Sequence, residues 1–281
     1  MTAGSWSDWL GREQRLEDEV TPKPVAAMAA TIGPAEQGVA PGEAIPPLWH
    51  WLYFLPIVPM DQIGADGHPK RGGFLPPIPL DRRMWAGGAL RFQDEIRIGD
   101  RLTKISRIDA VTEKEGRAGA MVFVTVSHTI ETARGPAVTE RQDIVYLPMP
   151  ERYTAPKAVP GPEQPLWQDD VLIDSVRLFR FSALTFNGHR IHYDLPYARD
   201  VEKYPGLVVH GPMQAMLLMG AALAHHPDKR PDGFKFRGIH PLFDFDRPRI
   251  VAQAAEGGVH LATLNSDGTQ CQQATLTWRE D

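Results

Sequence analysis

Hydrophobic and polar residues alternate in short runs along much of the chain, which is the pattern of antiparallel strands with one buried face. In the first half, runs rich in Val, Ile and Thr occupy residues 102–110, 121–132 and 138–147. In the second half, similar runs occupy residues 248–255, 258–265 and 270–278, with Asp267-Gly268 as a tight turn. The pattern predicts two similar antiparallel sheets, one in each half.

One segment has the pattern of a buried helix. Pro212 opens the run Met213–Leu223, which is apolar nearly all round and ends before Pro227. A helix without a polar face is buried, and a curved antiparallel sheet wrapped around it gives a layered α+β unit. The counterpart in the first half, Pro46–Leu55, is crowded with aromatic and proline residues, so we expect a shorter or degenerate helix there.

Proline divides the chain into parts. Residues 148–166 hold six prolines and predict a linker between an N-terminal domain, 1–147, and a C-terminal domain, 167–281. Residues 56–80 hold six prolines and four glycines, which predicts a long ordered loop of the kind that often has a function. Residues 1–45 are interpreted as partly helical, with a heavily charged segment Trp6–Val20 followed by a Pro- and Gly-rich stretch to Pro47.

Composition is that of an ordinary globular protein, with 42% hydrophobic and 23% charged residues. A net charge of -5 disfavours a nucleic-acid partner, and the longest apolar runs fall well short of the roughly 20 residues that span a bilayer. Residues 1–20 do not resemble a secretory signal. Cys271 is the only cysteine, which excludes an internal disulfide. We expect a cytoplasmic protein that acts on a small molecule, without a membrane partner.

The segment Phe179–Ala198 is the most promising for chemistry, because polar side chains follow a start that we interpret as strand-like. Within eight residues it holds Asn187, His189, Arg190, His192, Tyr193 and Asp194. The short run Leu207–Pro212 then brings His210 and Gly211 to the start of the buried helix. The free amides at a helix N-terminus can hold a carbonyl oxygen that gains negative charge.

The run FSALTFNGHRIH, residues 181–192, followed by His210-Gly211, resembles the MaoC-like, or hydratase 2, family. In that family an Asp is coupled to a His five residues later, and a downstream His-Gly starts the central helix of a hot-dog fold. The resemblance places His192 at the family histidine and Asn187 where most members have Asp. It places Gly211 at the glycine whose amide polarises the thioester carbonyl.

The phrases RRMWAGG, residues 82–88, and SALTFNGHRIHYD, residues 182–194, resemble one subgroup of that family more closely. This subgroup includes mesaconyl-C4-CoA (3-methylfumaryl-CoA) hydratase, itaconyl-CoA hydratase and the mitochondrial 3-hydroxyacyl-thioester dehydratase. The resemblance implies a double hot-dog fold of class α+β, with two antiparallel sheets that each wrap a central helix. It also implies that the first half shapes the acyl pocket and has lost the catalytic segment.

The function that this resemblance implies is a hydro-lyase that adds water to a short branched dicarboxylic enoyl-CoA, mesaconyl-C4-CoA or itaconyl-CoA, to give citramalyl-CoA. The substrate is then an acyl-CoA, with no cofactor besides the CoA it carries and no metal. A homodimer is possible through exposed sheet edges.

Each site residue has an expected role. We expect His192 to deprotonate the water, the Gly211 N–H to hold the enolate-like oxygen and Asn187 to orient water or thioester. Asn cannot donate a proton as a carboxylic acid can, so Tyr193 or Asp194 is a candidate to complete the pair. Arg190 is expected either to meet a second substrate carboxylate or to pair with Asp194 or Asp200.

Other residues have a weaker case. His210 and Tyr193 are also expected to contact substrate. Four basic residues either meet the CoA phosphates or form a solvated loop: Lys70, Arg71, Arg82 and Arg83.

Two other functions stay open at this stage. One is a dehydratase of fatty-acid synthesis that uses the same site in reverse, for which a long apolar tunnel is the distinguishing feature. The other is a non-catalytic protein that binds acyl thioesters, which Asn187 in place of Asp permits.

Overall fold

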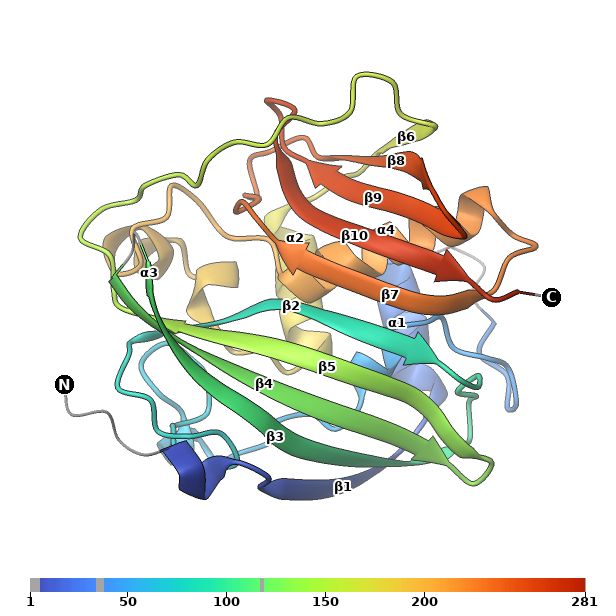
Figure 1. Cartoon of the computed structure of the whole chain (residues 1–281), viewed down its shortest axis with the longest axis horizontal. Helices are drawn as coiled ribbons and strands as arrows, with labels where there is room; N and C mark the ends of the chain where they lie inside the picture. Colours follow the sequence, from blue (N-terminus) through green and yellow to red (C-terminus); the bar gives the residue numbers. More distant parts are fainter. Residues whose placement is uncertain (1–5, 34–37, 117–118, 281) are drawn as a thin grey trace.

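A computed structural model describes residues 6–33, 38–116 and 119–280. Within this part of the chain, ten strands form one sheet in the order β1-β3-β4-β5-β2-β7-β10-β9-β8-β6 (Figure 1). All neighbouring strands in it pair antiparallel. The first five strands come from the N-terminal half and the last five from the C-terminal half. The two predicted sheets are therefore joined edge to edge into one.

The strands are longest in the N-terminal half. Their bounds are β1 Glu13–Glu19, β2 Arg82–Phe92, β3 Arg101–Gly116, β4 Gly119–Thr132, β5 Gly135–Leu147, β6 Trp167–Asp170, β7 Pro231–Gly238, β8 Arg249–Ala255, β9 Gly258–Leu264 and β10 Gln270–Trp278. All six strands predicted from alternation are present. Strands β2 and β7 form the seam between the halves. A Cβ on Gly87 would lie 2.5 Å from the Phe236 carbonyl oxygen, so the seam requires a glycine there.

Helices α1, α2 and α4 lie behind the sheet in Figure 1. Their bounds are α1 Pro22–Ile32, α2 Ser175–Leu184, α3 Leu195–Asp200 and α4 Gly211–His225, with short 3₁₀ turns η1 Trp6–Trp9, η2 Trp49–Leu52, η3 Met60–Gln62 and η4 Arg190–His192. The predicted buried helix is confirmed as α4, in which Met213, Leu218 and Ala222 are fully buried. The expected degenerate helix of the first half is confirmed as the single turn η2.

Two expectations for local structure were wrong. Residues 13–19 form an edge strand instead of a helix, because the register on β3 places Glu13 opposite Arg107 and Glu19 opposite Arg101. The start of the segment Phe179–Ala198 is helical, as the end of α2, and the Asp174 side chain caps this helix by accepting from the Arg177 N–H. Helix α1, which begins with Pro22 directly after Thr21, is the helical part of residues 1–45, although its bounds were not predicted.

The main hydrophobic core draws buried side chains from both halves, for example Leu90 and Ile130 from the first and Leu218 and Phe234 from the second. Residues 148–166 contain no helix or strand. They contact the start of β10, where the Gln270 N–H donates to the Val159 carbonyl at 2.8 Å, and an isolated bridge joins Pro160 to Thr269. The division into two domains stays a prediction. Among the described residues, no helix has the length and hydropathy needed to cross a membrane.

Candidate active site

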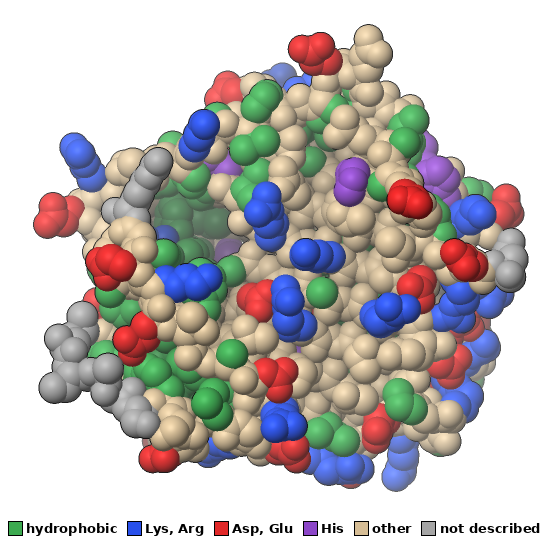
Figure 2. Space-filling view, viewed as in Figure 1, with side chains coloured by type: hydrophobic (Ala, Val, Ile, Leu, Met, Phe, Trp, Pro, Cys, Tyr) green, Lys and Arg blue, Asp and Glu red, His purple; other side chains and the backbone are tan. Residues whose placement is uncertain are grey.

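A cavity of about 1680 Å³ lies between the two halves and is lined by both. It brings together His68, Arg83 and Trp85 of the first half with Asn187, His192 and Gly211 of the second. On the face drawn in Figure 2 the surface is hollowed at the left of the view, and hydrophobic side chains form walls of the hollow. The sequence-predicted residues His192, Asn187 and Gly211 therefore share one ligand-sized space.

His192 ends the turn η4 and is buried, with only 7% of its surface exposed. Its Nδ1 lies 2.7 Å from the Val208 carbonyl oxygen. A carbonyl only accepts, so Nδ1 carries the proton and Nε2 keeps its lone pair. Burial, and after it the neighbouring His210 and His189, holds the pKa of His192 well below its usual value. At neutral pH this side chain is a neutral imidazole with a free basic nitrogen.

His210 lies behind His192 and does not line the cavity. The two rings stack with centroids 3.7 Å apart, and the His210 Nε2 lies 2.8 Å from the Ser182 Oγ. Its side chain is fully buried, and burial lowers its pKa to about 3. The structure therefore gives His210 a packing contact with the base, in place of the expected contact with substrate.

Gly211 begins α4, directly after His210, and lines the cavity. Its carbonyl accepts a hydrogen bond from the Gln272 Nε2 at 3.1 Å. A Cβ at this position would meet nothing closer than that same nitrogen at 3.7 Å, so crowding by protein atoms does not explain the glycine. A backbone left uncovered at a helix N-terminus lets a carbonyl oxygen approach the first amide closely.

Asn187 lines the cavity, but its Oδ1 accepts the backbone N–H of His189 at 3.0 Å. This is the turn-capping geometry typical of Asn. One lone pair of this oxygen is thus bonded within the turn, and the other end of the side chain is an amide donor. Asn187 shapes the turn that carries His189 and His192 to the cavity.

Arg190 and Tyr193 do not line the cavity. The Arg190 guanidinium pairs with Asp194 at 2.8 Å and lies over the Tyr197 ring at 4.2 Å. Tyr193 is 44% exposed, and its hydroxyl donates to the Gly188 carbonyl. Neither residue is therefore placed on the cavity, and of the arrangements expected for Arg190 the pairing with Asp194 is the one found. Asp194 caps α3, which removes it as a partner for His192.

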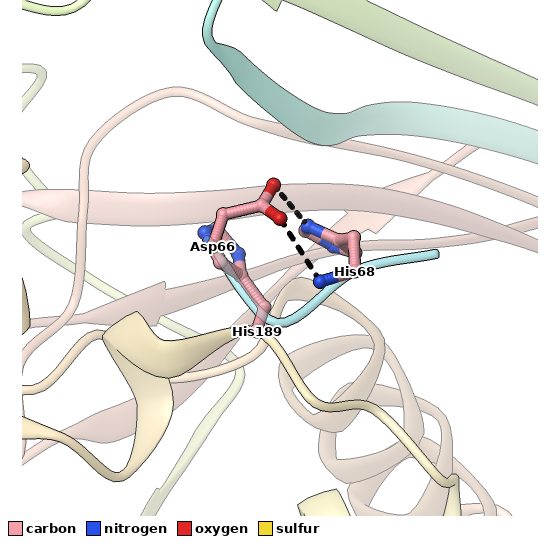
Figure 3. Close-up of side chains that lie close together, drawn as sticks. All are labelled: Asp66, His68 and His189. Atoms are coloured by element: carbon pink, nitrogen blue, oxygen red, sulfur yellow. Dashed lines mark hydrogen bonds and ion pairs between the residues drawn. The ribbon is translucent and has the colours of Figure 1, made fainter. Parts of the chain in front are cut away.

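Sequence reasoning missed the loop residues Asp66 and His68, which come from the half expected to be non-catalytic. Figure 3 shows them beside His189 of the catalytic segment, and the rings of His68 and His189 have centroids 4.3 Å apart. The His68 Nδ1 lies 2.9 Å from the Asp66 Oδ2. The only signal in the sequence was a Pro- and Gly-rich loop too long to be a simple connection.

Hydrogen bonds from Arg190 to backbone carbonyls of the loop join it to the segment Phe179–Ala198. The Arg190 N–H donates to the Asp66 carbonyl at 2.9 Å, and the Arg190 Nη1 donates to the Ala65 carbonyl at 3.0 Å. Gly67 has a φ of +89°, and a Cβ there would lie 1.8 Å from the Gly188 carbonyl oxygen. Only glycine permits this approach, so the loop and the segment form one rigid wall of the cavity.

A buried carboxylate holds His189 in place. The His189 Nε2 lies 2.8 Å from the Glu202 Oε1, and the Arg82 Nε lies 3.4 Å from the Glu202 Oε2. The Glu202 side chain is only 1% exposed, so its charge needs these partners. Arg82 is thereby committed to Glu202 and to the Tyr204 hydroxyl, to which its Nη2 donates at 2.6 Å.

The expected phosphate-binding residues all line the cavity: Lys70, Arg71, Arg82 and Arg83. Arg71 donates to the backbone carbonyls of Ile78 and Asp81. Arg83 has no carboxylate within ion-pair distance among the described residues, in contrast to Arg82. Lys70, Arg71 and Arg83 therefore keep their charge available to an anionic ligand.

Asp66, His68 and His189 are also the residues that come nearest to a metal site in the described part of the chain, with potential ligand atoms within 4.8 Å of one another. Their arrangement does not suit one. The His189 Nε2 is bonded to Glu202, and both Asp66 oxygens already accept from His68.

The fold and the site define a double hot-dog protein of the MaoC-like type. A MaoC-like dehydratase superimposes with a TM-score of 0.73 at 14% identity, covering 99% of this chain and all of that one. A Mycobacterium tuberculosis protein described as having a double hotdog fold superimposes with a TM-score of 0.61 at 15% identity, covering 99% of each chain. The predicted fold class is confirmed.

The chain belongs to the hydroxyacyl-thioester dehydratase type 2 family, whose model matches residues 48–244. It is 44% identical to the mesaconyl-C(4)-CoA hydratase of Chloroflexus aurantiacus over 281 aligned residues, which cover 98% of this chain and 99% of that one. It is 23% identical to the mitochondrial hydroxyacyl-thioester dehydratase type 2 of Schizosaccharomyces pombe, over 80% of this chain and 82% of the relative. The family recognised from the sequence is confirmed.

Proposed function

We propose that this protein is a hydro-lyase that adds water to a short branched dicarboxylic enoyl-CoA, with mesaconyl-C4-CoA as the first candidate and itaconyl-CoA as the second, to give citramalyl-CoA. The observation that carries the proposal is His192, a neutral imidazole with a free Nε2 in the cavity where α4 begins. The identity of 44% over nearly the whole length of a mesaconyl-C(4)-CoA hydratase supports this choice of substrate.

The proposed reaction uses His192 and the Gly211 N–H, which both line the cavity. The His192 Nε2 takes a proton from water as the water oxygen bonds to the β-carbon of the enoyl thioester. The electrons of the double bond move toward the thioester oxygen, which the Gly211 N–H holds as it becomes enolate-like. The protonated His192 then returns the proton to the α-carbon. Atoms and charges balance without a cofactor beyond the CoA of the substrate.

The substrate carboxylate needs a cation in the cavity, and Arg190 does not supply it because it is paired with Asp194. We assign this role to Arg83, which lines the cavity close enough to His68 to lower the pKa of that imidazole. A guanidinium without a carboxylate partner is suited to bind a carboxylate in two-pronged fashion.

A panel of enoyl-CoA esters with and without a second carboxylate, with mass detection of the hydrated product, tests both proposals. We expect the protein to prefer the carboxylated esters. If it hydrates none of the esters, the proposed function is wrong. Arg83→Gln is expected to lower that preference by about 10-fold or more, as loss of a charged hydrogen bond does. Arg91→Gln, an exposed arginine of the same strand β2 that pairs with Asp232 and does not line the cavity, is the matched control and leaves the preference unchanged. An unchanged preference in Arg83→Gln contradicts the carboxylate role.

The family model and the yeast relative favour a second candidate, dehydration of a 3-hydroxyacyl thioester. This is the same chemistry in the reverse direction, at the same His192. Long-chain 3-hydroxyacyl thioesters in the same panel distinguish the two candidate functions. Turnover of the long-chain thioesters without turnover of the dicarboxylic esters favours the second candidate.

A further inference from the structure

Addition of water is easiest when both water hydrogens are held by acceptors, because the oxygen lone pair is then directed at the electrophilic carbon. In the proposed function His192 accepts one hydrogen through Nε2. A carboxylate at the position of Asn187 would accept the other. Here the Asn187 Oδ1 is bonded to the His189 N–H, and the remaining amide group is a donor. The Asn187 oxygen, already engaged in the turn, is therefore a weaker second acceptor than a carboxylate would be.

The loop of the first half supplies an imidazole with the required tautomer. Asp66 accepts twice from His68, at Oδ1 from the backbone N–H at 3.0 Å and at Oδ2 from Nδ1 at 2.9 Å. Burial favours the neutral form of Asp66, but the His68 hydrogen bonds outweigh it and lower the carboxyl pKa to about 2. Burial lowers the pKa of His68 to about 4, against the opposing effect of Asp66. His68 is thus neutral with its proton on Nδ1, and Nε2 is an acceptor.

Three imidazoles in contact connect this acceptor to the base. The His68 ring packs on His189 at 4.3 Å, and His189 meets the edge of His192 at 5.4 Å and an interplanar angle of 88°. Glu202 fixes His189, which contacts the other two rings. All three rings line the one cavity. His68 and His192 each have Nδ1 bonded to protein, and neither Nε2 has a hydrogen-bond partner among the described residues.

We propose that His68 is a second catalytic residue, which holds the attacking water jointly with His192, and that Asp66 is the positioning residue that fixes its tautomer. The inference rests on the proposed function. The water donates one hydrogen to each Nε2, and its oxygen bonds to the β-carbon. The proton transferred moves to His192 and from there to the α-carbon, while the hydrogen on the His68 side stays on the new hydroxyl. Both imidazoles return to their starting state.

The test is a double-mutant cycle on Asp66 and His68. His68→Phe keeps the ring stacked on His189 but removes the acceptor. In Asp66→Asn the oxygen must stay on the His68 backbone N–H, so the amide NH₂ faces Nδ1 and moves the imidazole proton to Nε2. Each variant is expected to lower kcat about 10- to 100-fold with little change in KM. Asp61→Asn, an exposed carboxylate of the same loop, is the matched control and keeps the parent rate.

The double variant distinguishes catalysis from loop packing. Since Asp66 acts through His68, Asp66→Asn in the His68→Phe background is expected to lower kcat no further. Additive losses, or a His68→Phe enzyme at the parent rate, overturn the inference. Imidazole ¹⁵N shifts provide a readout independent of activity: His68 is expected as the Nδ1–H tautomer in the parent and the Nε2–H tautomer in Asp66→Asn.

The outcomes also separate this inference from the proposed function. If the parent protein hydrates none of the esters, the proposed function is wrong. If the parent hydrates them and activity is lost in His192→Ala but kept in His68→Phe, the function stands and only the role of His68 is wrong. Retention of one divalent metal per chain, with activity lost to a chelator and restored by that metal, makes the cluster a metal site and overturns the inference.

Discussion

The contact between Gly67 and Gly188 allows the role of the loop to be tested without removing any functional side chain. In Gly67→Ala the new Cβ starts 1.8 Å from the Gly188 carbonyl oxygen, whereas real Cβ contacts essentially never fall below 3.0 Å. The loop must therefore retreat by about 1 Å or more. Gly72→Ala is the matched control, since Gly72 has the same φ of +89° in the same loop but no atom closer than 3.8 Å.

The two substitutions share one energetic cost and differ in the other. A non-glycine residue at positive φ costs about 1–2 kcal/mol, which applies to both. Gly67→Ala also strains the hydrogen bond from the Arg190 N–H to the Asp66 carbonyl, worth about 1 kcal/mol. The expected losses of unfolding free energy are about 1.5 kcal/mol for Gly72→Ala and about 3 kcal/mol for Gly67→Ala.

The Gly67→Ala and Gly72→Ala variants are also expected to differ in activity. A displacement of about 1 Å at a reacting site can cost about 100-fold in rate, so Gly67→Ala is expected to lose about that factor in kcat/KM while Gly72→Ala keeps the parent value. The assay is hydration of mesaconyl-C4-CoA at a temperature at which both variants are folded by circular dichroism. Equal activities of the two variants would refute the argument that the loop forms a wall of the active site.

Three further predictions concern the histidines. The pKa values of His68, His192 and His210 in the folded protein lie below the unfolded value of about 6.5, so in acid the unfolded chain binds more protons than the folded one. The free energy of unfolding is therefore expected to stay level above pH 6.5 and to decrease as the pH is lowered from there. His68 alone is expected to account for a loss of about 3 kcal/mol by pH 4. Denaturant unfolding at pH 7, 5.5 and 4.5 checks this, and constant stability contradicts it. The acid limb of kcat/KM should likewise lie well below pH 6.5, since His192 must be neutral, and a limb centred above pH 7 contradicts that state. Ser182→Ala removes the hydrogen-bond partner of the His210 Nε2, and the His210 Nδ1 has no partner among the described residues. The substitution therefore leaves a buried imidazole without partners and is expected to lower the free energy of unfolding, measured by thermal unfolding, by about 1–3 kcal/mol.

The sequence predicted the parts of the fold that have a local period. Alternation identified the strands now called β3, β4, β5, β8, β9 and β10, and the all-apolar run Met213–Leu223 identified α4. Strand β1 was missed because it is mostly exposed and pairs only with β3, far along the chain, where arginines stand opposite Glu13 and Glu19. Helix α2 was missed because Phe179 and its neighbours have the composition of a strand, and the capping Asp174 decides the outcome.

The candidate site was predictable only where the residues lie close in sequence. His192, Asn187 and Gly211 were found through their spacing, and the structure places all three on one cavity. For Arg190 the sequence left a substrate carboxylate and a pairing with Asp194 or Asp200 open, because spacing alone does not show that the side chain turns back to Asp194. Asp66 and His68 could not be linked to His189, which follows more than 100 residues later, since that contact depends on how the loop packs across the two halves.

The most direct test of the central claim is the turnover of His192→Ala on mesaconyl-C4-CoA, beside His260→Ala on the outer part of β9 as control. The first variant is expected to lose about two to four orders of magnitude in kcat, with an unchanged circular dichroism spectrum and unchanged binding of citramalyl-CoA. The control is expected to retain the parent rate. Parent-like turnover by folded His192→Ala contradicts the assignment of the base.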